Sequence, residues 1–333
     1  MPTSLVNLAA AAYIEVMNTT TSSASRPLGA AADTAHAAER QHLVADDGRH
    51  LAASWFEPPA RPAHAVAVVS SATGVPRGYY RAFAQWLAAR GYAVLSYDYR
   101  GIAGSRRGPL RDEAATMKDW AALDMSAALA AAEARRATQQ LPLLLVGHSF
   151  GGNAIAFARG VERADALLML GSQLGEPRLY PGVHRAVAEF FFRAWLPGIV
   201  SLTGSLPGWA MGGGAQALPS GVARQWAAWG LRRGWAYADP SMQPHRSASA
   251  INVPVHLWDV SDDLSFAPSR AVDALAEQFR NAAVQRHSIT PAQVGAKSLG
   301  HFGAFRRSPG PVLWQRLMEP VEAAAPLLKP RVR

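Results

Sequence analysis

The chain has 333 residues, which is enough for one large α/β domain or two small ones. Its composition, 49% hydrophobic and 17% charged, indicates a compact soluble protein with a sizeable core. No stretch approaches the roughly eighteen consecutive apolar residues of a membrane-spanning helix. Cysteine is absent, which excludes disulfides, thiolate nucleophiles and cysteine-ligated zinc. The net charge is +9, but the arginines are scattered in pairs, so we expect no nucleic-acid binding.

The N-terminal segment differs from the rest of the chain. Residues 1–40 are rich in alanine, serine and threonine with little pattern, which predicts a disordered leader. No basic segment precedes its apolar run, and Glu15 interrupts that run, so it does not look like a secretory signal. We therefore expect a cytoplasmic protein with one folded domain over residues 41–333. The sequence does not indicate an oligomeric state.

From residue 41 onward, apolar strands alternate with helices. The pattern predicts strands over residues 42–45, 51–56, 65–69, 92–98, 143–146, 164–170, 253–258 and 283–289. It predicts helices over residues 79–89, 118–138, 153–159 and 269–278, and a last one from about residue 311. Such alternation is typical of a mostly parallel sheet with helices on both faces, and we expect an α/β fold of this class.

The alternation stops between about residues 171 and 250. This insert holds five of the ten tryptophans, namely Trp195, Trp209, Trp226, Trp229 and Trp235. We predict a helical lid inserted into one domain rather than a second domain. Two interpretations of its aromatic residues stay open: they line an apolar pocket for an acyl group, or they form the core of the insert itself.

One short segment indicates chemistry. Residues 143–146 are all apolar, as in a buried central strand, and lead directly into the pattern Gly147-x-Ser149-x-Gly151. The glycines permit a tight turn from strand to helix that exposes the serine hydroxyl. The turn also places the amide of Phe150 at a helix N-terminus, where it can stabilise a negative charge. Ser149 is therefore a candidate nucleophile.

A serine nucleophile needs a base, and His301 is the best candidate. Of the ten histidines, it alone lies in a glycine-rich loop after the last predicted strand. In a doubly wound sheet, the loops at the carboxyl ends of the strands carry the site. His148 is adjacent to the serine, but neighbouring side chains on such a turn diverge, so we assign it to packing or positioning.

The acid should lie between the serine and the histidine in the chain. The loop after residue 258 offers Asp259, Asp262 and Asp263. Asp259 can simply end the strand. We prefer Asp263 and keep Asp262 as the alternative, since one member of the doublet can instead begin the next helix.

The oxyanion hole needs a second backbone donor beside Phe150. It should come from the loop after residue 69, where Thr73 and Gly74 form a turn. We assign the donor to the amide of Val75 and keep Thr73 as the alternative. Pro76 has no N–H to donate.

Together these residues resemble the α/β-hydrolase superfamily, from about residue 41 to the C-terminus. Residues 147–152 (Gly-His-Ser-Phe-Gly-Gly) match its nucleophile elbow, and residues 97–105 look like its D-x-R-G-x-G-x-S loop, with Ala103 altering the spacing. Asp263 fits the acid position, and residues 300–302 (Gly-His-Phe) fit the catalytic histidine loop. The nearest branch is the serine aminopeptidase-like and monoacylglycerol-lipase-like group, in particular a bacterial subset.

The resemblance implies a serine hydrolase that uses a Ser149–His301–Asp263 triad without cofactor or metal. The family's His-Gly dipeptide at the oxyanion loop is replaced by Thr73-Gly74, which leaves backbone donation intact. We expect a small acyl substrate and cleavage of a carboxylic ester through an acyl-enzyme. An amidase or peptidase, or an acyltransferase, would use the same triad. A protein that binds a ligand without turnover is a further alternative.

Overall fold

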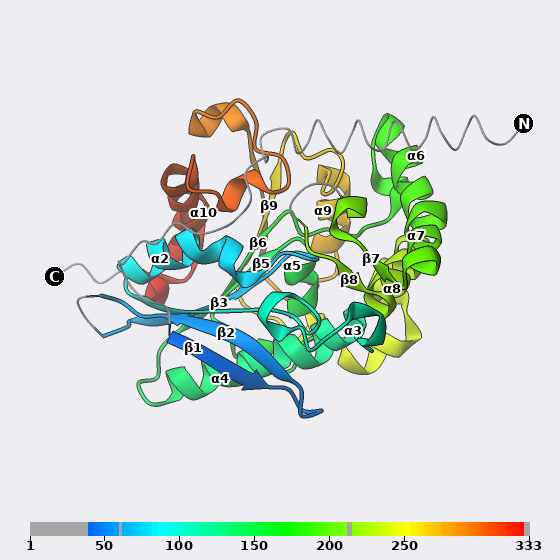
Figure 1. Cartoon of the computed structure of the whole chain (residues 1–333). Coiled ribbons are helices and arrows are strands. Elements are labelled where there is room, and N and C mark those ends of the chain that lie inside the picture. Colours follow the sequence, from blue (N-terminus) through cyan, green and yellow to red (C-terminus); the bar gives the residue numbers. More distant parts are fainter. Residues whose placement is uncertain (1–38, 60–61, 212–214, 330–333) are drawn as a thin grey trace, which may run out of the picture.

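The structure is a computed structural model that describes residues 39–59, 62–211 and 215–329 (Figure 1). The expected leader lies outside the described residues, except for Glu39 and Arg40, which begin the first strand. That strand therefore starts before residue 41, where we placed the folded domain.

Eight strands form one sheet in the order β1-β2-β4-β3-β5-β6-β9-β10. The strands are β1 (Glu39–Val44), β2 (His50–Phe56), β3 (Ala65–Ser70), β4 (Tyr92–Tyr97), β5 (Leu143–His148), β6 (Ala166–Leu170), β9 (Val255–Val260) and β10 (Val284–Ile289). β2 is antiparallel to both of its neighbours, and every pair from β4 to β10 is parallel. The carboxyl ends of the parallel strands therefore meet at one edge of the sheet.

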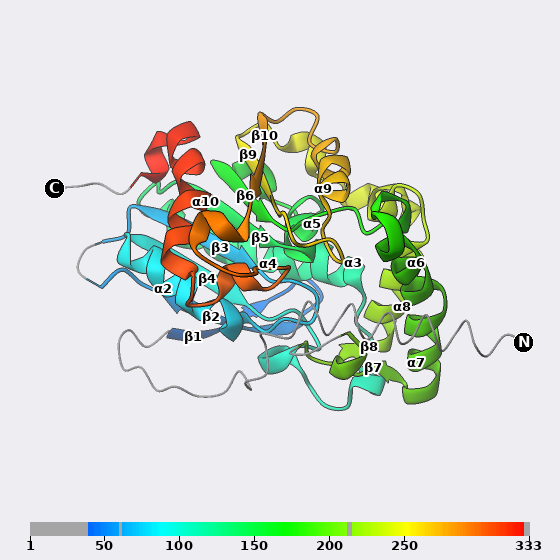
Figure 2. The same cartoon turned by 90° about the horizontal axis from the view of Figure 1, so that it is seen from above.

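Helices cover both faces of this sheet, as Figures 1 and 2 show. α2 (Arg81–Ala89) and α10 (Gly310–Ala324) lie on one face. α4 (Met125–Ala137), α5 (Phe150–Ile155) and α9 (Ser269–Ala276) lie on the other. Along β3, alternate residues belong to the two opposite cores, which is why the strand carries no polar side. The predicted fold class is confirmed.

The insert lies between β6 and β9. It contains α6 (Gly182–Phe190), α7 (Leu196–Thr203) and α8 (Ser220–Gly230), and a short hairpin of β7 (Ser205–Leu206) and β8 (Leu218–Pro219). A π-helical turn over Phe191–Trp195 joins α6 to α7. In both views these helices gather on one side of the molecule, beyond the sheet (Figures 1 and 2).

One helical run of the insert passes a simple test for a membrane span. Gly182–Thr203 has 22 residues and a mean hydropathy of 1.2 in its most apolar window, of which 28% is buried. This finding rests on length and composition alone. In the structure, the run contributes residues to the cavity described below.

Two expected helices differ in detail. The helix expected over residues 118–138 comprises α3 (Met117–Asp119), a π-helical turn over Trp120–Asp124 and α4. The turn ends at Asp124, whose buried carboxylate accepts hydrogen bonds from the backbone N–H and the guanidinium of Arg100. The helix expected to reach residue 159 ends at Ile155, because the next carbonyl, that of Ala156, accepts the N–H of Ser247. Both partners are distant in sequence, so the local pattern could not reveal them.

Candidate active site

Ser149 lies at a strained turn between β5 and α5. Its φ of 54° and ψ of −121° are unusual for a residue with a side chain. A Cβ added at Gly147 would lie 2.4 Å from the Cα of Gly152, and one added at Gly151 would lie 2.1 Å from the carbonyl oxygen of Ser70. The flanking glycines are therefore required by the close approach of backbone, as expected for a nucleophile elbow.

His301 and Asp263 form a buried pair. The Nδ1 atom of His301 lies 2.5 Å from Oδ2 of Asp263, and Oδ1 of the same carboxylate accepts the N–H of Phe266 at 3.1 Å. The ring of Phe266 stacks on that of His301, with centroids 4.9 Å apart. A carboxylate acceptor on Nδ1 holds the proton there and leaves Nε2 available as a base.

Asp262 has a different role from its neighbour. Its two carboxylate oxygens accept the N–H groups of Leu299 and Gly300, each at 2.9 Å. These are the two residues that precede His301. The structure thus divides the doublet: Asp263 contacts the histidine ring, and Asp262 anchors the loop that carries it.

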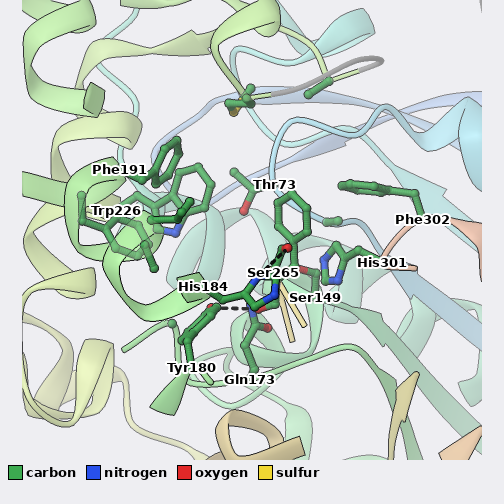
Figure 3. A pocket seen from close by; sticks show the side chains of 18 residues that line it. Thr73, Ser149, Gln173, Tyr180, His184, Phe191, Trp226, Ser265, His301 and Phe302 are labelled. Atoms are coloured by element: carbon green, nitrogen blue, oxygen red, sulfur yellow. Dashed lines mark hydrogen bonds between the residues drawn. The ribbon is translucent and has the colours of Figure 1, made fainter. Parts of the chain in front are cut away.

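Ser149 and His301 line one cavity and lie side by side in Figure 3. Within the described part of the chain, no hydrogen bond joins the serine hydroxyl to the histidine ring. Such bonds are often long before substrate binds. Only 7% of Ser149 and 5% of His301 is exposed, so water has little access to either residue.

The amides near the serine differ in availability. The N–H of Phe150 is at the first turn of α5, where it has no acceptor within the helix. The N–H of Val75 donates to the carbonyl of Ala72 at 3.1 Å, and Val75 is not among the residues that line the cavity. Thr73 does line it, and among the described residues its amide has no acceptor. The geometry therefore favours Thr73, our alternative, over Val75.

The insert supplies an apolar wall opposite the serine. The apolar residues of the insert that line the cavity are Val187, Ala188, Phe191, Phe192, Met211, Ala215 and Trp226. The ring of Trp226 packs edge-on against Phe191 and Phe192, at centroid distances of 5.3 and 5.7 Å. Figure 3 places Phe191 and Trp226 across the cavity from Ser149 and His301.

The five tryptophans of the insert do not share one role. Trp226 lines the cavity, whereas Trp229 is buried and donates to Asp239, and Trp195 donates to the carbonyl of Ala210. Trp235 is buried, and Trp209 is 65% exposed. Trp226 therefore lines a cavity, as the first interpretation requires, whereas Trp229 and Trp235 belong to the core, as the second requires.

Polar residues that the sequence did not single out also line the cavity. Oγ of Ser265 lies 3.1 Å from Nδ1 of His184, which joins the acid loop to α6. Gln173 and Tyr180 both donate to the carbonyl of Phe266. Their positions follow β6 and precede α9, so proximity to predicted strand ends was the only available signal. Within the described ranges, no group of three His, Asp or Glu residues is placed to hold a metal ion.

Comparisons with known proteins bear on the family and the fold. Residues 61–209 match the family model described as serine aminopeptidase, S33, and this range includes the elbow. No curated protein matches the chain.

Solved structures with a similar fold include a lipase and two esterases. A soluble variant of monoglyceride lipase from Saccharomyces cerevisiae, in complex with a substrate analogue, is 12% identical with a TM-score of 0.61, covering 90% of this chain and 99% of its own. An esterase from Pyrococcus furiosus is 12% identical with a TM-score of 0.56, covering 90% and 98%. Brefeldin A esterase, described as a bacterial homologue of human hormone sensitive lipase, is 16% identical with a TM-score of 0.55, covering 98% and 86%. The shared fold shows that this chain has an α/β-hydrolase fold, and residues 61–209 within it are similar to the serine aminopeptidase family.

Proposed function

We propose that the chain is a serine hydrolase that cleaves a carboxylic ester through an acyl-enzyme. The observation that carries the proposal is the pairing of His301 with Asp263 at 2.5 Å, where His301 lines the same cavity as the strained Ser149. A serine at such an elbow is reactive only where a base and an acid stand beside it. The three residues also follow one another in the chain order expected for this fold.

In the proposed mechanism, Oγ of Ser149 attacks the carbonyl carbon of the ester. Its proton passes to Nε2 of His301, and Asp263 stabilises the resulting imidazolium through Nδ1–H. The tetrahedral oxyanion accepts hydrogen bonds from the backbone N–H groups of Phe150 and Thr73. As the intermediate collapses, His301 returns the proton to the departing alcohol. Water then attacks the acyl-enzyme by the same route and releases the acid and Ser149.

The insert supports an acyl substrate with an apolar part. Its wall of aliphatic and aromatic side chains faces the serine, and burying an alkyl chain there contributes about 0.8 kcal/mol for each CH₂ group. We propose that the insert acts as a lid over the site. The names of similar structures, a monoglyceride lipase and two esterases, are in keeping with ester cleavage. An amidase, a peptidase or an acyltransferase would use the same three residues.

A fluorophosphonate probe tests the class of the protein. We expect wild-type protein to be labelled at Ser149, and Ser149→Ala to lose labelling and about 10⁴-fold or more of its ester turnover. Ser265→Ala is the matched control, because it removes a second serine hydroxyl from the same cavity and should stay labelled. Folded wild-type protein without labelling at Ser149 would refute the proposal.

A second assay separates the reactions that share the triad. 4-Nitrophenyl esters of increasing acyl length and the matching 4-nitroanilides present the same acids with different leaving groups. We expect ester turnover to exceed anilide turnover by at least about a hundredfold, which is a difference of about 2.7 kcal/mol in the barrier. Anilide turnover equal to ester turnover would favour a peptidase. Transfer to an added alcohol in place of water would identify an acyltransferase.

A further inference from the structure

His148 precedes the candidate nucleophile and is fully buried. It is not among the residues that line the described cavity, yet both of its ring nitrogens are engaged near that cavity. Nε2 lies 2.9 Å from the backbone carbonyl oxygen of His301, and Nδ1 lies 2.8 Å from the hydroxyl of Tyr80. One ring therefore connects α2 and its preceding turn to the loop of the candidate base.

The direction of each hydrogen bond follows from simple chemistry. A carbonyl oxygen only accepts, so Nε2 of His148 carries the proton. Burial, with the nearby His301 as a second cause, lowers the pKa of His148 well below its usual value, so the ring is neutral and Nδ1 accepts. Burial raises the pKa of Tyr80 well above its usual value, so its hydroxyl stays protonated and donates to Nδ1.

The Tyr80 hydroxyl has a second partner. It accepts the backbone N–H of Ala72 at 2.9 Å. Ala72 directly precedes Thr73, whose amide we assign to the oxyanion hole. Three hydrogen bonds therefore run from the oxyanion loop through Tyr80 and His148 to the carbonyl of His301. Ala72, Tyr80 and His148 are each at most 1% exposed.

We propose that His148 and Tyr80 are positioning residues that fix the oxyanion loop and the loop of the base relative to the nucleophile. This inference rests on the proposed hydrolase function. The two loops follow β3 and β10, which lie at different places in the sheet. His148 is bonded covalently to Ser149. Its ring binds the loop of the base directly and the oxyanion loop through Tyr80, so it sets the positions of both loops against the serine itself.

Other contacts complete the frame around the base. Asp262 binds the two amides before His301, and Tyr79 donates to the carbonyl of Phe302 just after it. His148 adds the bond to the carbonyl of His301 and is the member that also reaches the oxyanion loop. Catalytic groups must be held to within about 0.5 Å of their productive geometry, and several short hydrogen bonds to one loop can achieve this.

Tyr80→Phe tests the proposal by removing one hydroxyl. Ala72 loses its acceptor and His148 loses its donor, so the Thr73 amide should move from the oxyanion. We expect kcat to fall by about 10- to 100-fold, less than the loss of a whole oxyanion donor, while KM changes less than about threefold. Affinity for a trifluoromethyl ketone analogue of the transition state should fall by the same factor as kcat.

Tyr92→Phe is the matched control. It also removes a buried tyrosine hydroxyl that donates a hydrogen bond, here to the carbonyl of Leu328, but this hydroxyl lies at the opposite end of β4 from the site. Both variants should lose similar thermal stability, and Tyr92→Phe should keep wild-type kcat. If Tyr80→Phe also keeps wild-type kcat and analogue affinity, or if KM and kcat change together, the positioning role is wrong.

Substitutions of His148 provide a second test. Glutamine can donate to the carbonyl of His301 and accept from Tyr80, whereas leucine can do neither. We expect His148→Gln to retain at least about tenfold more kcat than His148→Leu at matched stability, in line with the loss of buried hydrogen bonds. Equal activity of the two variants would contradict the proposal.

A readout independent of turnover separates this inference from the hydrolase function. In Tyr80→Phe, hydrogen exchange at the amide of Ala72 should become at least about tenfold faster, while it stays slow in Ser149→Ala. Absent labelling of wild-type Ser149 would defeat the hydrolase function alone. Unchanged exchange at Ala72 in Tyr80→Phe would defeat the network, whatever the enzyme assay shows.

Discussion

The wall of the cavity that carries Ser149 and the wall that the insert supplies are held by different interactions. On the first, directed bonds fix each group: Asp263 to the ring of His301, Asp262 to the backbone before it and His148 to its carbonyl. On the second, aromatic side chains such as Trp226 pack edge to face. Directed bonds specify positions to a fraction of an ångström, whereas packing tolerates exchanges of similar volume. The first wall, which we call the directed wall, can hold reacting groups in place. The second, which we call the packed wall, can select a substrate by its shape.

The largest effect should come from breaking the directed wall at Asp263. Asp263→Asn keeps the shape of the side chain, but the N–H of Phe266 should retain the amide oxygen, so the NH2 group faces Nδ1 of His301. That donor moves the ring proton to Nε2, which can then no longer act as a base, so we expect kcat to fall about 10⁴-fold. Asp262→Asn removes one acceptor from the backbone of Leu299 or Gly300 and leaves the histidine ring bonded. It should cost about tenfold or less, in line with the loss of one hydrogen bond. Steady-state kinetics of both variants on one ester decide the matter, and a larger loss in Asp262→Asn would reverse the assignment.

The packed wall should respond in substrate preference rather than in chemistry. Trp226→Ala removes an apolar surface from the cavity, so we expect kcat/KM for a long-chain ester to fall at least about tenfold and that for an acetyl ester to change less than about threefold. Trp209→Ala is the matched control, because Trp209 belongs to the insert, is 65% exposed and does not line the cavity. A series of 4-nitrophenyl esters provides the measurement. Equal profiles for the two variants would mean that Trp226 only packs the insert.

The same contrast explains how far the sequence could predict the site. The elbow at Ser149 and the loop of His301 follow from local glycine patterns at strand ends, and the structure brings both residues to one cavity. The roles of Asp262 and Asp263 could not be assigned from the sequence, because the two residues are chemically alike and their partners lie 37 or 38 residues away. The choice of Thr73 over Val75 as the proposed donor depends on a turn in which the N–H of Val75 is already bonded. Patterns show which residues can act, but not which contacts they make.

The tryptophans show the limit most clearly for the packed wall. Trp226 and Trp209 occupy similar apolar, alanine- and glycine-rich surroundings in the sequence. Trp226 nevertheless faces the site, and Trp209 faces solvent. Their orientation is set by how α6, α7 and α8 pack on one another, and no local period encodes that packing. Predictions of substrate preference therefore required the structure, whereas the prediction of the reaction class did not.

The smallest effect concerns the pH dependence of stability, and it tests the buried ring of His148 directly. Its pKa is lowered by burial, so the unfolded chain binds more protons than the folded chain at acidic pH. The free energy of unfolding should therefore fall as pH drops below about 6.5, with a slope of up to about 1.4 kcal/mol per pH unit from this ring. Burial beside His287 lowers the pKa of His256 to about 4, and this adds a similar slope in every variant.

His148→Gln should thus lose stability less steeply than wild type between pH 7 and pH 5 in urea titrations, while Ser149→Ala keeps the wild-type slope. Parallel curves for His148→Gln and wild type would mean that the ring is already charged in the folded protein, and the directed wall would then lack the Nδ1 acceptor on which the hydrogen bond from Tyr80 depends.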